Sequence, residues 1–214
     1  MLPELSEQGL AFLHQEEGWA GKPYWPGSVS GVTIDPGYDL GYVSLETFCS
    51  DWEKHLSKLH CDRLSKVVGQ RGQAAKVAIL RLLDIGIPKD KAMKVFDDVL
   101  EPRYAKMTLE AFPGADKLGD NTWTALFSLV YNRGSKVPEF FTDPRREEMY
   151  AIREAVQRRN HMDIADQLVV MARVWEGGRK DDDGLVGRRE REAQLVDPTV
   201  KERLVELRKN RRTP

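Results

Sequence analysis

Hydrophobic side chains recur at steps of three and four residues along most of the chain after residue 44, which is the spacing of one helix face. The pattern predicts a helix over residues 45–59 that begins at the capping residue Ser44, and a second helix over residues 75–83. Helical spacing continues from residue 88 to residue 112, which predicts either one helix that is broken near Pro102 or two short helices. The body of the protein is therefore predicted to be helical.

The clearest apolar stripe begins after Asp120 or Asn121 and ends before Gly134. Its members stand at positions i, i+3, i+4, i+7 and i+8, namely Trp123, Leu126, Phe127, Val130 and Tyr131. We expect this helix to form the centre of the main core. Apolar spacing predicts another helix over residues 164–175, and two cap-then-proline pairs predict further helix starts, at Asp143-Pro144 and Asp197-Pro198.

Residues 18–42 differ from the rest of the chain. They hold six glycines and three prolines around the run Val32-Thr33-Ile34, a composition typical of a small antiparallel sheet with tight turns. The predicted fold is α+β and mostly helical, in a single domain with a small N-terminal antiparallel β-sheet lobe (about 18–42), a larger helical lobe (about 44–195) and a basic C-terminal helix or tail (196–214). A cleft between the two lobes is the expected ligand site.

Composition narrows the class of protein. The chain has 214 residues and a net charge of −1, yet residues 1–50 carry seven acids and one base, which leaves 27 acids and 32 bases for the remainder. No apolar run approaches the roughly 20 residues of a spanning helix, so no stable membrane insertion is expected. Two cysteines and four scattered histidines predict neither a disulfide scaffold nor a metal site. The basic tail lacks nucleic-acid-binding motifs, and no nucleic-acid partner is expected.

Glu17 is the first candidate for chemistry. A helix from about Ser6 places it on the same face as Leu10 and Leu13, whereas Glu16 is turned about 100° away. Burial on that face and the negative end of the helix dipole both favour a protonated carboxyl, as a general acid requires. A surface ion pair at the helix end is the alternative that the spacing leaves open.

Further polar groups follow Glu17 in the predicted sheet. Strand alternation places Thr33 and Asp35 on one face, and a turn then lets Asp39 return toward the same region. Two acids and a hydroxyl opposite Glu17 are the groups needed to cleave a glycosidic bond. Flat rings on which sugars could stack are offered by Tyr24 and Trp25. The alternative is that both aspartates cap turns, which is common for Asp near Pro-Gly.

Four short elements follow one another in this segment: Glu17-Gly18, Pro23-Tyr24, Gly31-Val32-Thr33-Ile34 and Gly37-Tyr38-Asp39-Leu40-Gly41. In this order they resemble the catalytic segment of the phage-type lysozymes, a family of glycoside hydrolases, and most of all its pesticin-like branch, which has an Asp six residues after the Thr. The resemblance implies that Glu17 is the general acid and that Thr33 and Asp39 hold and activate a water. Asp35 departs from the family pattern, and it is either a turn residue or a third carboxylate of the site.

Two later elements extend the resemblance toward the C-terminus. The run from Ser128 to Gly134 is similar to the family's helix that ends in Phe-Asn-x-Gly, which implies that Asn132 faces the cleft and binds substrate. Trp175 and the run from Gly184 to Ala193 are similar to the family's closing pattern of Trp, Gly-Leu, paired Arg and Glu-Ala.

The paired arginines of that closing pattern have two interpretations. Arg188 and Arg189 stand four and three residues before Glu192, which predicts ion pairing on a solvated helix face. The second interpretation is that they bind acidic peptide stems or phosphate-rich cell-wall polymers.

The resemblance implies a lysozyme-like fold and a peptidoglycan muramidase that hydrolyses the β-1,4 bond between N-acetylmuramic acid and N-acetylglucosamine, with no metal or cofactor. The alternatives are a lytic transglycosylase and an inactive peptidoglycan-binding protein of the same fold. The chain start lacks the pattern of a signal peptide. We therefore expect synthesis in the cytoplasm and action on periplasmic peptidoglycan, as a phage endolysin after holin release or as an effector delivered by a secretion system. The expected partners of this monomer are glycan strands, and an immunity protein if it is an effector.

Overall fold

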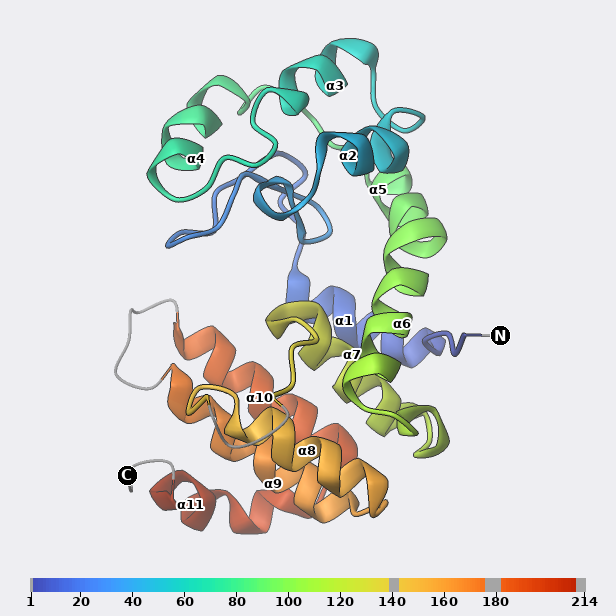
Figure 1. Cartoon of the computed structure of the whole chain (residues 1–214), viewed down its shortest axis with the longest axis vertical. Coiled ribbons are helices and arrows are strands. Elements are labelled where there is room, and N and C mark those ends of the chain that lie inside the picture. The colour runs from blue at the N-terminus through green and yellow to red at the C-terminus, as the bar shows by residue number, and fades with distance from the viewer. Residues whose placement is uncertain (1, 139–142, 176–181, 211–214) are drawn as a thin grey trace. The chain divides into compact units, whose positions relative to one another are not determined.

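The computed structural model of the chain describes residues 2–138, 143–175 and 182–210. These residues form a mostly helical α+β protein with a small two-stranded antiparallel sheet, as predicted. The chain divides into two compact units, which we call the strand unit (residues 14–102) and the helical unit (residues 1–13 with 103–214) (Figure 1). Residues 44–102, assigned from sequence to the helical lobe, thus belong to the same compact unit as the strands.

The sheet of the strand unit pairs β1 (Thr33–Ile34) with β2 (Tyr38–Asp39), so that Thr33 faces Asp39 and Ile34 faces Tyr38. Residues 32–35 are all buried, so this segment shows no alternation of buried and exposed positions. The other elements of this unit are the end of α1 (Glu7–Glu17), η1 (Leu40–Tyr42), α2 (Leu45–Trp52), α3 (Lys58–Ser65), α4 (Gln73–Ala78), η2 (Ile79–Arg81), α5 (Lys89–Val95), the π-helical η3 (Phe96–Leu100) and the start of α6 (Glu101–Ala111).

The predicted helix over residues 45–59 is two helices, α2 and α3. Ser44 caps α2 as predicted, and Ser57 caps α3, each accepting a hydrogen bond from the backbone N–H three residues later. The apolar spacing runs across the break, but the second serine cap begins a new helix. Cys49 and Cys61 consequently lie in different helices, as free thiols.

The expected break near Pro102 is a change of helix type. Proline has no N–H for the carbonyl one turn earlier, and the chain passes from α5 through the π-helical turn η3 directly into α6, where Pro102 is the second residue. The predicted helix over residues 75–83 likewise changes type, because α4 ends at Ala78 and continues as the 3₁₀ turn η2.

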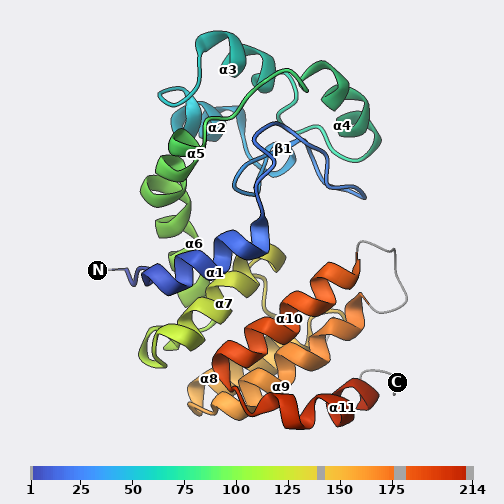
Figure 2. The same ribbon diagram turned by 180° about the vertical axis from the view of Figure 1, so that it is seen from behind.

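The helical unit is centred on α7 (Asp120–Arg133), which begins and ends where the sequence predicts and whose residues 122–131 are all buried. α10 packs against both α7 and α9, and α8 and α11 each pack against α9 (Figures 1 and 2). The other elements of this unit are η4 (Ala115–Lys117), α8 (Glu147–Gln157), α9 (His161–Met171), η5 (Ala172–Val174), α10 (Asp182–Val196) and α11 (Val200–Asn210).

Two predicted helix starts are displaced. Asp143 and Asp197 accept hydrogen bonds from the backbone N–H two residues later, which forms turns, and α8 and α11 begin after those turns. Residues 211–214 of the predicted C-terminal tail lie outside the described residues. None of the described helices is both long enough and apolar enough to cross a membrane.

Candidate active site

Glu17 is the last residue of α1 and is partly exposed. Gly18 ends the helix directly after it: its N–H donates to the carbonyl of His14 at 3.0 Å, and its φ is +68°, a left-handed conformation that suits glycine. The pair Glu17-Gly18 therefore sets a carboxyl at the C-terminal end of a helix.

Asp35 holds the loop that follows Glu17. With 2% of its surface exposed, it accepts hydrogen bonds at Oδ2 from the backbone N–H of Ala20 at 3.0 Å and of Gly21 at 2.5 Å. Burial raises the pKa of the Asp35 carboxyl, and the two backbone hydrogen bonds oppose that rise. Of the two roles that the sequence leaves open, these contacts fit the structural one.

Thr33 joins two neighbours in the sheet region. Its backbone N–H and C=O pair with those of Tyr24 at 2.8 and 2.9 Å, and it faces Asp39 across the strand pair. Opposed residues of an antiparallel pair point to the same face, with Cβ atoms roughly 4.5–5.5 Å apart. The Thr33 side chain is buried, yet its Oγ1 has no hydrogen-bond partner among the described residues. Buried hydroxyls normally have a partner, so this one is suited to hold a water or a ligand atom.

Asp39 is held by backbone donors from two glycines. Its Oδ1 accepts from the N–H of Gly41 at 2.8 Å and of Gly31 at 3.0 Å. The two glycine backbones lie so close that a Cβ on Gly31 would come within 2.3 Å of the Gly41 nitrogen. Burial raises the pKa of Asp39, opposed by these hydrogen bonds and by the positive charge of Arg71. The carboxylate is thus fixed in place beside Thr33.

The Tyr24 hydroxyl lies near the predicted carboxyls. Burial is the main cause that raises the pKa of the Tyr24 hydroxyl, and the negative charges of Asp35, Glu17 and Asp39 raise this pKa further. All three predicted carboxyls therefore lie within electrostatic reach of this one hydroxyl, which stays protonated and can donate a hydrogen bond. The structure brings together Glu17, Asp35, Asp39, Thr33 and Tyr24 within the strand unit. The element Pro23-Tyr24 pointed to Tyr24 in the sequence, but neither spacing nor composition indicated the role of its hydroxyl.

Trp25 lies beside this cluster in sequence. Its indole Nε1 donates to the carbonyl of Ser30 at 3.0 Å, and the Lys76 ammonium lies 5.6 Å from its ring centroid. A cavity of about 660 Å³ opens elsewhere in the strand unit. It is lined by residues from the end of α3 through α4 to the end of η2, and by none of the predicted catalytic residues. We take the carboxyl cluster as the candidate site because the groups for acid and base chemistry lie there.

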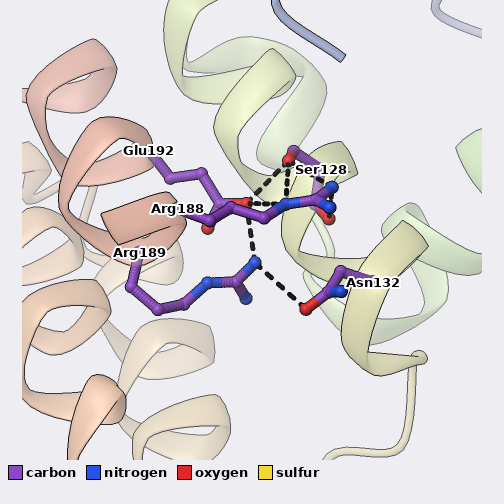
Figure 3. A network of polar contacts seen from close by, with 5 residues as sticks. All are labelled: Ser128, Asn132, Arg188, Arg189 and Glu192. Carbon is purple, nitrogen blue, oxygen red and sulfur yellow. Dashed lines mark hydrogen bonds and ion pairs between the residues drawn. The ribbon is translucent and has the colours of Figure 1, made fainter. Parts of the chain in front are cut away.

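Asn132 belongs to the helical unit, whereas the other six predicted site residues belong to the strand unit. It lies at the end of α7, and its Oδ1 accepts a hydrogen bond from Nη2 of Arg189 at 3.4 Å (Figure 3). Its side chain is thereby linked to the buried network described next.

The paired arginines are not on a solvated face, and that prediction is wrong. Arg188, Arg189 and Glu192 are 4%, 0% and 0% exposed, because α10 packs on α7 and α9. Glu192 Oε1 accepts from Arg189 Nη2 at 2.8 Å, from Arg188 Nε at 3.2 Å and from the Ser128 hydroxyl at 2.6 Å (Figure 3). The i,i+4 pairing is present within α10, but it is buried, and its hydrogen bonds to Ser128 join α10 to α7. Buried and paired in this way, neither guanidinium presents an exposed grip for stem peptides.

A scan against protein-family models and a search of the curated proteins find no match to this chain. Within residues 2–138, 143–175 and 182–210, no group of three or more His, Cys, Asp or Glu side chains could hold a metal ion.

Proposed function

We propose that the protein is a peptidoglycan muramidase, a lysozyme that hydrolyses the β-1,4 bond between N-acetylmuramic acid and N-acetylglucosamine. The observation that carries the proposal is the buried Thr33 hydroxyl, which has no protein partner among the described residues and faces Asp39 across the sheet. Such a hydroxyl can still donate and accept hydrogen bonds. Because it lies beside a fixed carboxylate, it is suited to hold a water molecule.

The chemical roles follow from what each group can do. Glu17, at the end of α1, protonates the leaving glycosidic oxygen. Thr33 holds the attacking water, and Asp39 orients it and accepts its proton. Asp35 keeps the loop after Glu17 in place, and the protonated Tyr24 hydroxyl is available to donate a hydrogen bond to substrate or to one of the carboxyls. A lytic transglycosylase uses no water, so it would have no use for the Thr33 and Asp39 pair.

The biological setting is part of the proposal. The enzyme acts on the glycan strands of periplasmic peptidoglycan, either as an endolysin or as an antibacterial effector. Asn132, in the helical unit, is a further substrate-binding residue in this proposal.

Glu17→Gln tests the acid assignment. It removes the transferable proton and keeps the shape, so the rate of release of reducing ends from purified Gram-negative peptidoglycan should fall by about 10²–10⁴-fold. The matched control is Glu16→Gln on the neighbouring residue, which should keep the wild-type rate. A Glu17→Gln variant as active as the parent would contradict the assignment.

Mass spectrometry of the released fragments tests the reaction class. Hydrolysis gives fragments with free reducing ends, whereas anhydro-sugar ends would identify a transglycosylase. Retention on insoluble peptidoglycan with no fragment released would identify an inactive binding protein.

A further inference from the structure

Arg71 is anchored beside the candidate site by its backbone. It forms an isolated antiparallel bridge with Gly31, and the next residue, Gly72, donates its N–H to the carbonyl of Ser30 at 2.9 Å. Gly31 is also the residue whose N–H binds Asp39. The segment that fixes Asp39 therefore also fixes the position of Arg71.

The side chain of Arg71 runs over Gly41 onto the ring of Tyr42. A Cβ on Gly41 would lie 2.6 Å from Cγ of Arg71, and the guanidinium carbon lies 5.0 Å from the Tyr42 ring centroid. The Tyr42 hydroxyl donates to the carbonyl of Val29 at 3.3 Å, which orients the ring. Tyr42 is 59% exposed, so a large part of this aromatic surface stays accessible beside the guanidinium.

The Arg71 guanidinium makes no hydrogen bond or ion pair with the residues that the structure describes. Arg63 of the same unit, by contrast, is paired with Asp84 at 2.6 Å. A guanidinium offers five donors in a planar fork that matches a carboxylate, and stacking on an aromatic ring limits its conformations before it binds. Arg71 is thus oriented and still has its donors available.

We propose that Arg71 and Tyr42 form a subsite for a sugar that carries a carboxylate, with the guanidinium on the carboxylate and the ring against the apolar face of the sugar. The inference rests on the proposed function, where the carboxylate belongs to N-acetylmuramic acid, either as its free lactyl acid or on its stem peptide. The subsite makes the protein prefer peptidoglycan fragments to neutral chitin-type strands.

Binding of small fragments that carry no scissile bond tests the subsite independently of catalysis. Three ligands are titrated by calorimetry: the disaccharide N-acetylglucosaminyl-N-acetylmuramic acid with its stem peptide, the same disaccharide without the peptide, and chitobiose. Arg71→Gln should weaken the acidic ligands about tenfold, the loss expected for one charge-assisted contact, and leave chitobiose unchanged. Arg71→Lys, which keeps the charge and loses the fork, should recover part of that loss.

The ligand arms and a control variant decide the outcome. Loss confined to the peptide-bearing fragment assigns the stem carboxylates, and loss confined to the peptide-free disaccharide assigns the free lactyl acid. Loss for both acidic fragments means that Arg71 binds either carboxylate. Arg81→Gln, on an exposed arginine at the end of η2, should leave all three affinities unchanged. Equal loss for chitobiose, no loss for the acidic fragments, or no binding by the parent would overturn the subsite.

The subsite and the proposed function can fail separately. Arg71-dependent binding by a protein that releases no reducing ends would remove the muramidase proposal and support the subsite. If the protein hydrolyses peptidoglycan but its affinity for the acidic fragments does not change on Arg71→Gln, the muramidase proposal is supported and the subsite is overturned.

Discussion

The two compact units bury polar side chains in different ways. In the helical unit, the Glu192 carboxylate binds the Arg188 and Arg189 guanidiniums and the Ser128 hydroxyl, so charged side chains are paired with one another where α10 meets α7. In the strand unit, the carboxylates of Asp35 and Asp39 are bound by backbone N–H groups, and the buried Thr33 hydroxyl is left over. The backbone donors fix both carboxylates in place, and burial raises the pKa of both carboxyls although these hydrogen bonds oppose the rise.

The largest expected effect is on the stability of the helical unit. Glu192→Gln removes the fully buried carboxylate charge that both the Arg188 and the Arg189 guanidinium contact, which should lower the free energy of unfolding by about 3–5 kcal/mol. Arg208→Met breaks an exposed pair with Glu190 and should cost about 1 kcal/mol or less. Urea unfolding measures the free energy of unfolding of both variants. Equal decreases would mean that the buried network contributes no more to stability than a surface ion pair.

The next effect tests how tightly the strand unit fixes Asp39. The new Cβ of Gly31→Ala would lie 2.3 Å from the Gly41 nitrogen and 2.4 Å from Oδ1 of Asp39, so backbone must move, at a cost of about 1–3 kcal/mol. Hydrolysis should fall as well, because the carboxylate shifts.

Gly86→Ala is the matched control for that variant. No atom lies within 4 Å of its added Cβ, and the free energy of unfolding should change by less than about 1 kcal/mol. If Gly31→Ala were as mild as Gly86→Ala in unfolding and in activity, the close approach of the two glycines would not be what holds Asp39.

Local patterns were sufficient to predict much of this arrangement. The apolar stripe and Gly134 define α7, and a glycine-rich segment around Thr33 predicts the small sheet. Glu17 stands at the end of α1 because Gly18 is next in the chain. Each of these features depends on residues only a few positions apart, so the spacing of residues in the sequence is enough to predict it.

Features that depend on distant residues were missed. An i,i+4 ion pair has the same spacing on a solvated face as in a core, so the burial of Arg188 and Arg189 depends on α7, about 60 residues earlier. The role of the Tyr24 hydroxyl depends on where Asp35 and Asp39 return to it. Likewise, apolar spacing cannot show that Ser57 caps a second helix.

Two buried threonines, one in each unit, allow a direct comparison in which the expected changes in stability are the smallest. Thr33 and Thr122 are 3% and 2% exposed, but the Thr122 hydroxyl is bonded to Nδ1 of His161 at 2.9 Å, whereas the Thr33 hydroxyl has no partner among the described residues. Thr122→Val should therefore lower the free energy of unfolding by about 1 kcal/mol, and Thr33→Val should leave it unchanged or raise it.

Activity should change in the opposite sense. Thr33→Val loses the hydroxyl that holds the attacking water, so hydrolysis should fall steeply in a protein that is as stable as the parent, while Thr122→Val keeps its rate. Thermal unfolding and the release of reducing ends, measured on the same preparations, test both. A Thr33→Val variant that is destabilised like Thr122→Val and still hydrolyses peptidoglycan would mean that this hydroxyl supports the fold, and the water would have to be held elsewhere.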